Sequence, residues 1–570
     1  MNRFYLISSL STVALLIFSC QDRSRSPWDL ISTDSTAIAN GRLLFERDCK
    51  SCHNFKSGGI GPSLAGVTKA VSPIWITDFV HDPKSAIEAK DKRADSLFSK
   101  FKTIMPSFPQ YSEEQMESLL SFLHSHRDGA KEDTDSNALS NPIPEPIPMS
   151  DLVIELELIA QVPASSPELP FTRITKLASK PDSDQLFVVD LRGKLYRLDG
   201  KTPSVYFDIT KVKPRFIHQP GLASGFGSFA FHPAFAQNGL LYTSHTEGAG
   251  SAKSDFGYND SIPVALQWIL TEWKTLTPGS NTFDGQPREL FRIDMVSPIH
   301  GMQEIVFNPT AQKGDGDYGL LYVGIGDGGC AENGFAFLCH NLEQLWGTVI
   351  CIDPQADERA HRNYSIPKSN PFVKSTNSGI RKEIFAYGFR NPHRITWSQA
   401  GQMLVSNIGQ HHIESIYSIR AGGDSGWPLR EGTFAIDSTG SLNDVHPLAP
   451  NDSLNQFNYP VVQYDHDEGN AIAGGFEYTG SRISGLQGKF VFMDVVKGRL
   501  FYVSMNDLKI GSLAPIKEWR VSLDGKIKSL QEMAGAAKVD GRFGVSNRGD
   551  LYLTTKPDGK IYRLVQGREK

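Results

Sequence analysis

The stretch Cys49-Lys50-Ser51-Cys52-His53 places two thiols and an imidazole at a spacing that suits covalent attachment of a c-type haem. The two thiols can add to the two vinyl groups of one porphyrin, and His53 can then bind the iron as its proximal ligand. A zinc site would need a second Cys or His pair nearby in the sequence, and a thioredoxin-like dithiol would need a βαβ context. The motif therefore predicts haem c, electron transfer and a compartment outside the cytoplasm.

A low-spin haem of this kind needs a second axial ligand, and a thioether ligand raises the reduction potential of the iron. Met105 is the candidate, because Pro106 keeps it out of helical geometry in a loop that can cross the haem. Met116 is the alternative, but its helical spacing with Leu119 and Leu120 is typical of a core residue.

Other polar residues that could do chemistry occur in turns of the second half of the chain. His300 follows Ser297-Pro298-Ile299, Arg390 and Asn391 precede Pro392, and Gly409-Gln410 precede His411-His412. Each is a weak signal alone, and adjacent histidines on one strand are expected to point apart. The same holds for three aspartates in Gly-rich turns that could bind Ca²⁺ but usually serve the turn itself: Asp315, Asp317 and Asp327.

The elements that must position the haem residues form a small helical unit. A polar tether over 21–35 precedes a helical pattern that runs from about Thr36 to Arg47, directly before the haem motif. Ser112-Glu113-Glu114 opens a final helix in the manner of a capping box. These limits predict a domain over 36–127, followed by an acidic and then Pro-rich, semi-rigid linker over 128–150.

From residue 151 to 570 the pattern changes to short alternating runs between turn residues. One pattern recurs, in which a turn residue is followed by apolar and aromatic residues. Its six copies begin at Gln185, Gly239, Gly319, Gly401, Gly488 and Gly549. Six copies of one small sheet favour an all-β six-bladed β-propeller, because each sheet can bury its faces only against its neighbours. The expected protein is thus multidomain, with a small all-α domain before the propeller.

The N-terminus is typical of a secretion signal. Phe4 to Phe18 is mainly apolar but too short to span a membrane, and Ile17-Phe18-Ser19-Cys20 resembles a bacterial lipoprotein box. We expect a lipoprotein-type signal peptide over 1–20, a lipid on Cys20 and a periplasmic or cell-envelope location. Ordinary cleavage and an uncleaved anchor are the alternatives. The net charge of −5 gives no reason to expect nucleic acid as a partner.

Three further cysteines are expected to be structural. Cys330 and Cys339 are nine residues apart in a Gly-rich loop, which favours a local disulfide in an oxidising compartment. Cys351 lies in the apolar run Thr348 to Asp353 and is expected to be an inert buried thiol.

Residues 36–127 resemble a class I cytochrome c. The resemblance includes the haem motif, Gly61-Pro62-Ser63-Leu64-Ala65-Gly66, the Met105-Pro106 segment that would cross the haem, and the closing helix. It covers the whole helical domain.

Residues 171–564 resemble the soluble pyrroloquinoline quinone (PQQ)-dependent glucose/sorbosone and aldose sugar dehydrogenases, whose fold is a six-bladed propeller. The resemblance runs in order through Gln185–Gly193, Gly227–Pro233, Gly324–Gly329, Ser365–Pro371, Tyr387–Pro392, Gly422–Pro428 and Arg542–Gly544.

This resemblance implies that His300 is a general base. It would take the hydroxyl proton of the substrate while hydride passes to the C5 carbonyl carbon of PQQ, a task that suits an imidazole near neutral pH. Arg390 and Asn391 match the Arg-Asn pair that contacts the quinone, and Arg390 would stabilise the developing oxyanion.

The same resemblance implies further cofactor contacts. Gln219 lies where the family has a glutamine near the histidine, and Lys497 and Arg542 would contribute charge toward the carboxylates of PQQ. Backbone oxygens around Gly409 and Gln410, together with PQQ, would hold Ca²⁺.

Two positions depart from the better-studied members. Ile408 stands in the Gln-Gly-Pro loop of the family and cannot donate a side-chain hydrogen bond, and Ile299 replaces the acid before the histidine. The Ile408 variant resembles the Hedgehog-interacting-protein-like branch, some members of which are not enzymes.

The expected function is a quinohaemoprotein oxidoreductase. It would oxidise a sugar or related alcohol at PQQ and pass the electrons through haem c to an external acceptor. The linker would keep the haem at a high effective concentration near the propeller. The alternative is a non-enzymatic carbohydrate- or protein-binding propeller with an attached electron-carrier cytochrome. A Ca²⁺-dependent lactonase lacks support in the order of the motifs.

Overall fold

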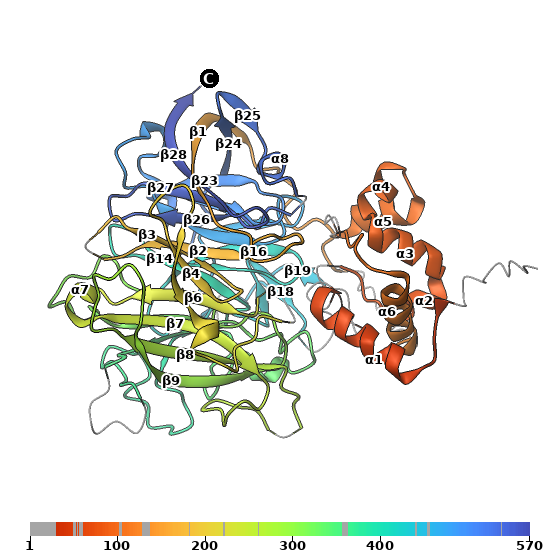
Figure 1. Ribbon diagram of the computed structural model, residues 1–570, viewed down its shortest axis with the longest axis horizontal. Coiled ribbons are helices and arrows are strands. Elements are labelled where there is room, and N and C mark those ends of the chain that lie inside the picture. Colours follow the sequence, from red (N-terminus) through yellow and green to blue (C-terminus); the bar gives the residue numbers. More distant parts are fainter. Residues whose placement is uncertain are drawn as a thin grey trace, which may run out of the picture.

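The computed structural model describes residues 30–569 without residues 50–52, 54, 56–60, 102–104, 106, 128–136, 182, 220–222, 260, 356–362, 439–441, 453–455 and 537. The predicted signal peptide, Cys20 and Cys52 lie outside the described residues. The chain forms a helical N-terminal domain that lies beside a much larger β-rich domain (Figure 1). None of the described helices is long and apolar enough to cross a membrane.

The helical domain is built around two long helices that cross. Its helices are α1 (Ser35–Leu44), continued by η2 (Phe45–Cys49), then α2 (Val67–Ala70), α3 (Pro73–His81), α4 (Pro83–Glu88), α5 (Lys92–Phe101) and α6 (Glu113–Ser125). Gly41 permits the close crossing of α1 and α6, because a Cβ atom there would lie 1.9 Å from the carbonyl oxygen of Ser118. The fold of this domain thus starts with a helix that leads directly into the haem motif.

Helix α6 begins as the sequence predicts. The Ser112 hydroxyl accepts a hydrogen bond from the backbone N–H of Gln115, and the Gln115 side chain accepts one from the N–H of Ser112. Met116 is 2% exposed and belongs to the core of this domain, which confirms that it is a core residue. Leu30 and Ile31, which precede the predicted domain of residues 36–127, also pack against this core.

The β-rich domain consists mainly of units of four strands, each unit antiparallel within itself. They are β2 (Ile174–Ser179), β3 (Leu186–Asp190), β4 (Lys194–Arg197), β5 (Ser204–Asp208); β6 (Phe226–Phe231), β7 (Leu240–Gly248), β8 (Leu266–Lys274), β9 (Gln286–Met295); β10 (Glu304–Phe307), β11 (Leu321–Ile325), β12 (Thr348–Ile352), β13 (Ile384–Tyr387); β14 (Pro392–Trp397), β15 (Met403–Asn407), β16 (Ile413–Ile419), β20 (Val462–Asp465); β21 (Ile472–Glu477), β22 (Lys489–Asp494), β23 (Leu500–Ser504), β24 (Lys517–Leu523); and β26 (Arg542–Val545), β27 (Leu551–Thr555), β28 (Lys560–Glu569) with β1 (Met149–Gln161).

Smaller elements lie between or beside these units. Strands β17 (Arg430–Glu431), β18 (Phe434–Ile436) and β19 (Val445–His446) form a small sheet, and β25 (Lys526–Lys528) pairs with β24. Two short helices, α7 (Phe235–Asn238) and α8 (Leu530–Ala534), lie in connections.

The six sequence repeats coincide with one position in these units. They become β3, β7, β11, β15, β22 and β27, which are the second strands of their units. The first strands contact one another in the cyclic order β2, β6, β10, β14, β21 and β26, and β26 contacts β2 again. The last unit combines both ends of the domain, because β1 pairs antiparallel with the C-terminal strand β28. Repeated sequence thus corresponds to repeated structure.

The Pro-rich segment before β1 is bound to the β-rich domain. The backbone N–H of Leu139 donates to the carbonyl of Val445 at 2.9 Å. The N–H groups of Ile143 and Ile147 donate to the carboxylates of Asp465 and Glu468 at 3.1 and 3.0 Å. Residues 149 and 150 already belong to β1. We call residues 137–148 the strap, since this part of the predicted linker is fixed along its length.

Candidate haem pocket and active site

The haem-binding histidine is held in one orientation. His53 is 8% exposed, and its Nδ1 lies 2.8 Å from the carbonyl oxygen of Pro62. A carbonyl can only accept, so Nδ1 carries the proton and Nε2 is the atom left to bind iron. Burial is the main cause that lowers the pKa of His53, which favours the neutral imidazole that a metal requires.

The space around His53 fits a haem. A Cβ atom on Gly61 would lie 2.4 Å from Cε1 of His53, so this glycine leaves room for the ring. His53, Cys49 and Met105 line one cavity of about 1820 Å³, which is larger than the ~300–1,000 Å³ of most ligand pockets. The structure therefore brings three of the four predicted haem residues to one cavity, and Cys52 lies outside the described residues.

The other predicted site residues gather at one end of the β-strands. Neighbouring strands are antiparallel, so the residues before each first strand and the loops between second and third strands lie at the same end. His300 precedes β10, Arg390 precedes β14, Gln410 lies between β15 and β16, and Lys497 lies between β22 and β23. The fold thus assembles residues that are far apart in the sequence.

His300 is buried and hydrogen-bonded through Nδ1. It is 8% exposed, and Nδ1 lies 2.8 Å from Oδ1 of Asp327 in the loop after β11. Its φ of 53° is unusual for a residue with a side chain and marks a backbone that its surroundings hold in place. In the part of the chain that the structure describes, His300 Nε2 has no hydrogen-bond partner, so it is available to a ligand.

Asp327 is fixed from several sides. Gly329 N–H donates to Oδ1 at 2.8 Å, and Trp427 Nε1–H donates to Oδ2 at 3.1 Å. Burial acts most strongly and would raise the pKa of Asp327, but His300, Arg390 and the Gly329 N–H together lower it below its ordinary value. Asp327 is therefore an ionised carboxylate that accepts the Nδ1 proton of His300.

Arg390 lies beside the same aspartate with its own contacts. Its Nε donates to Oε1 of Gln410 at 2.7 Å, and its Nη2 forms an ion pair with Glu332. Its carbonyl accepts the N–H of Asp327 at 2.8 Å. Asn391 is 4% exposed and follows in the same turn. His300, Asp327 and Arg390 thus form one constellation, although the Arg390 guanidinium is already paired.

Three further predicted residues have separate surroundings. Gln219 is exposed and, with Lys497, lines the cavity that also holds His53. Lys497 Nζ donates to the carbonyls of His466 and Asp467 at 3.1 and 2.8 Å. Arg542 is 7% exposed, and its Nη2 lies 3.2 Å from Nε2 of His393. No contact of Gln219 with His300 is present among the described residues.

Buried cations exceed their acidic partners near Arg542. Burial is the main cause that lowers the pKa values of Arg173 and Arg542 to about 10 and of Lys556 to about 8. Asp540 faces all three cations. Among the residues that the structure describes, Arg542 Nε and both polar atoms of the Asn470 side chain are buried without a hydrogen bond. These orphaned groups and this surplus of positive charge fit a bound polycarboxylate such as PQQ.

The loop before β16 is organised by a carboxylate. Oε1 of Glu431 accepts the N–H groups of Gln410, His411, His412 and Ile413 at 2.7–3.0 Å. The expectation that His411 and His412 point apart on a strand is wrong, because both lie in a turn and their ring centroids are 4.9 Å apart. Within the described residues, no group of three or more His, Cys, Asp or Glu could hold a metal ion. Ca²⁺ on the backbone oxygens of Gly409 and Gln410 stays a prediction.

The cysteines are all buried or half-buried thiols in the described residues. Cys330 and Cys339 are free rather than disulfide-bonded, and a hydrogen bond between them with burial raises the pKa of Cys339. The predicted disulfide is therefore absent from this structure. Cys351 is 1% exposed in β12, which confirms it as a buried thiol.

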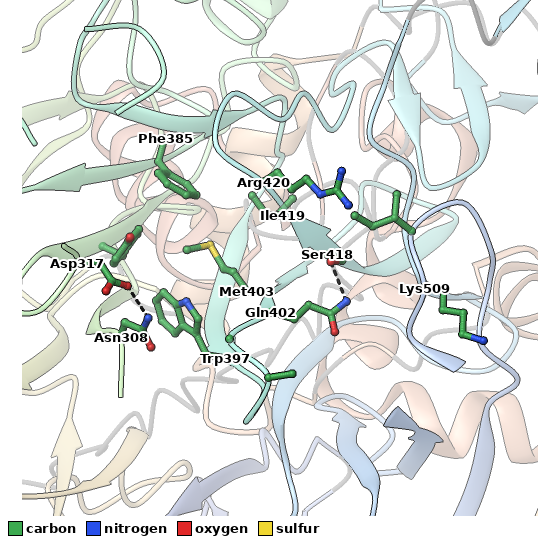
Figure 2. Close-up of a pocket in the computed structure, with 14 residues that line it drawn as sticks. Asn308, Asp317, Phe385, Trp397, Gln402, Met403, Ser418, Ile419, Arg420 and Lys509 are labelled. Carbon is green, nitrogen blue, oxygen red and sulfur yellow. Dashed lines mark hydrogen bonds between the residues drawn. The ribbon is translucent and has the colours of Figure 1, made fainter. Parts of the chain in front are cut away.

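A second cavity, of about 690 Å³, lies at the opposite ends of the strands. Figure 2 shows its lining, in which Asn308 donates to Asp317 and Gln402 donates to Ser418. None of the residues proposed for haem, PQQ or catalysis lines it. The turn of Asp317 is thus a satisfied structural turn, as its sequence indicated.

Several residues of this site are not evident from the sequence. Asp327 lies in one of the Gly-rich turns that could bind Ca²⁺ but usually serve the turn itself, and no motif distinguishes Trp427, Glu332 or Asn470 as site residues. The pattern Gly326-Asp327-Gly328-Gly329 is the available signal, since it places a carboxylate in a tight turn after a strand.

Comparison with known proteins defines both domains. The cytochrome c family model matches residues 38–127, and the glucose/sorbosone dehydrogenase model matches residues 171–563. The second match covers more than half of the chain, so the protein belongs to the glucose/sorbosone dehydrogenase family and carries a cytochrome c domain.

Individual relatives are distant. The HIPL1 protein of Arabidopsis thaliana is 26% identical over 439 residues, which cover 69% of this chain and 58% of that protein. Quinoprotein glucose dehydrogenase B of Acinetobacter calcoaceticus is 26% identical over 284 residues, which cover 48% of this chain and 55% of that protein. A crystal structure of glucose dehydrogenase matches with a TM-score of 0.50 and 16% identity over 72% of this chain and 99% of that one, a likeness of fold alone.

Proposed function

We propose that the protein is a quinohaemoprotein dehydrogenase. It oxidises a sugar or related alcohol at PQQ in the β-rich domain and passes the electrons through haem c to an external acceptor. The observation that carries this proposal is the buried His300, which is oriented by Asp327 and has Nε2 free among the described residues. The resemblance of the β-rich domain to quinoprotein sugar dehydrogenases supports it.

The chemistry divides between the cofactors and the chain. PQQ, when bound, supplies the carbonyl that accepts hydride, and haem c supplies a one-electron centre. His300 Nε2 accepts the hydroxyl proton of the substrate, and the ionised Asp327 stabilises the imidazolium that results. The buried cations Arg173, Arg542 and Lys556 would hold the carboxylates of PQQ.

Three finer features belong to the same proposal. The cyclic order of the first strands supports a six-bladed propeller. Ca²⁺ would bind the backbone oxygens of Gly409 and Gln410. Lipid attachment at Cys20 would anchor the protein in the cell envelope, where PQQ and an external acceptor are both accessible.

One observation favours the non-enzymatic alternative. Arg390 Nη2 is already paired with Glu332, and Ile408 offers only its backbone carbonyl, 3.5 Å from Nη1 of Arg390. A propeller that binds a carbohydrate or protein without PQQ would keep this ion pair. A relative from Mus musculus that is named Hedgehog-interacting protein fits this alternative.

Reconstitution distinguishes the two functions. Haem-loaded protein is titrated with PQQ and Ca²⁺ in a calorimeter, then mixed with a panel of aldoses and alcohols while the haem absorbance is followed. Substrate-driven haem reduction that is lost in His300→Ala supports the dehydrogenase. Absence of PQQ binding contradicts it, and saturable sugar binding without PQQ would establish the alternative.

A further inference from the structure

The haem site and the active-site end of the β-rich domain share one cavity. The cavity of about 1820 Å³ has His53 and Met105 on one side and Lys497 and Asn470 on the other. Since haem fills only part of such a volume, the remainder connects the haem pocket to the end of the strands where His300 lies. The haem pocket therefore opens toward the end of the β-rich domain at which His300 lies.

An aromatic pair joins the two domains beside this cavity. Phe101, the last residue of α5, packs edge to face against His411, with ring centroids 5.5 Å apart and planes at 64°. The two residues are 7% and 9% exposed. Phe101 also lines the cavity, as does Met105, which is four residues further along the chain.

His411 continues directly to the proposed active site. It follows Gln410, and Oε1 of Gln410 accepts the hydrogen bond from Arg390 Nε at 2.7 Å. The loop cannot shift easily, because Glu431 holds four consecutive N–H groups, and a Cβ atom on Gly409 would lie 1.9 Å from the carbonyl oxygen of Ile413. A short path thus runs from Phe101 across the ring contact to His411, along the chain to Gln410, and through a hydrogen bond to Arg390.

The strap restricts the cytochrome domain to this neighbourhood. Ile143 and Ile147 are bonded to Asp465 and Glu468, so only the nine residues 128–136 separate the strap from the helical domain. Nine residues span at most ~30–32 Å even when fully extended. The cytochrome is thereby kept at a high effective concentration at the β-rich domain.

We propose that Phe101 and His411 form the docking contact between the cytochrome and the β-rich domain, and that this contact is the route by which electrons reach the haem. The route rests on the proposed dehydrogenase function, whereas the docking contact does not. Oxidation of one alcohol carbon to a carbonyl releases two electrons and two protons. The haem iron takes the electrons singly, from Fe(III) to Fe(II) in each transfer. An external one-electron acceptor, ferricyanide in the assay, removes each electron, and the protons leave to solvent.

The docking contact is tested without PQQ. Haem-loaded F101C/H411C is treated with a short bis-maleimide, and cross-linked peptides are identified by mass spectrometry. The control is L43C/H411C, because Leu43 is 65% exposed on α1 and lies outside the shared cavity. We expect cross-linking of the 101–411 pair to be at least about tenfold faster than that of the control. Equal rates, with haem absorbance and melting temperature unchanged, would overturn the docking contact.

The electron route is tested on the PQQ-loaded protein by comparing two acceptors. The haem reports transfer within the molecule, and a phenazine dye takes electrons from the β-rich domain directly. In Phe101→Ala and His411→Ala we expect haem reduction to slow about tenfold or more while dye reduction stays within about twofold. His411→Phe keeps an aromatic ring and should recover most of the rate. His412→Ala, in the adjacent position, should match the wild type.

The outcomes separate the two proposals. Dye reduction that is absent from the wild type means that the dehydrogenase function has failed, while the cross-linking result still decides the docking contact. Normal haem reduction in both Phe101→Ala and His411→Ala, in a protein whose dye activity is intact, would overturn the electron route.

Discussion

His53 in the helical domain and His300 in the β-rich domain are each 8% exposed, and each has Nδ1 2.8 Å from an oxygen atom. The oxygen differs: it belongs to the carbonyl of Pro62 for His53 and to the carboxylate of Asp327 for His300. A neutral carbonyl fixes the tautomer without stabilising a positive charge, which suits a metal ligand. A carboxylate also stabilises the imidazolium, which suits a base. The identity of one partner atom thus suits two histidines of equal burial to the different tasks proposed for them.

The largest expected effect comes from removing the iron ligand. His53→Ala should abolish the low-spin haem spectrum and all substrate-driven haem reduction, because it removes the predicted proximal ligand of the iron. The dye-linked activity of the β-rich domain should persist. Absorbance spectra and a dye assay on the same preparation check both expectations, and loss of dye activity together with the haem would contradict the separation of roles.

Removing the proposed base should also have a large effect, but on substrate oxidation rather than on the haem. His300→Ala should lower kcat by about 10²–10⁴-fold with either acceptor, since general base catalysis contributes that range. The haem spectrum should be unchanged. Steady-state kinetics and the spectrum of the variant provide the check, and a kcat within twofold of the wild type would remove His300 from the mechanism.

Changing the partner of His300 tests whether a carboxylate and a carbonyl affect a histidine differently. Asp327→Asn keeps the shape but accepts a neutral hydrogen bond, as Pro62 does for His53, so we expect kcat to fall about 10–100-fold. Its pH profile should shift, because the carboxylate no longer stabilises the imidazolium. A variant with the wild-type pH profile would mean that the charge of Asp327 is irrelevant.

The effect of Asp327→Asn on the stability of the fold should depend on pH. The folded-state pKa of Asp327 is lowered, so its ionisation stabilises the fold above about pH 4, and this contribution is lost as the pH falls through the folded pKa. The difference in melting temperature between wild type and Asp327→Asn should therefore narrow below about pH 4.

A third buried histidine gives the smallest expected effect. Nε2 of His466 lies 3.1 Å from Oε1 of Glu414, but here burial raises the pKa of Glu414 to about 8 and lowers that of His466 to about 4. The pair is therefore neutral at pH 7, unlike His300 with Asp327. Because the folded-state pKa of Glu414 is raised, its contribution to stability is full below about pH 4.5 and is lost as the pH rises toward 8.

Glu414→Gln retains both hydrogen bonds and removes this titration. The free energy of unfolding of the variant minus that of the wild type should therefore increase by about 1–3 kcal/mol from pH 5 to pH 8. Denaturant unfolding at the two pH values measures the change. A constant difference would show that Glu414 is already ionised at pH 5.

The extent to which sequence predicts each region follows from how its residues are spaced. The haem motif lies within five residues, so local spacing alone identifies Cys49 and His53. Repeats of one strand pattern likewise predict six strands that occupy equivalent positions. Asp327 and Trp427 escape such analysis, because only the arrangement of separate loops brings them to His300.

The contacts of the strap cannot be predicted from the sequence for a different reason. Its contacts are made by backbone N–H groups, which every residue except proline has, and its partners Asp465 and Glu468 are more than 300 residues away. Composition correctly indicates a stiff segment but carries no sign of what that segment touches.

The alternation of proline in Asn141-Pro-Ile-Pro-Glu-Pro-Ile-Pro148 makes the length of this segment depend directly on its number of residues. Prolines cannot donate, so Ile143 and Ile147 are among the few residues that can anchor it, and a Pro-rich chain advances about 3.1 Å per residue. Inserting one Pro-Ile pair between the anchors would therefore offset the cytochrome by about 6 Å rather than slacken its attachment. The gap between the two domains could thus change by whole proline steps without altering either of the proposed sites.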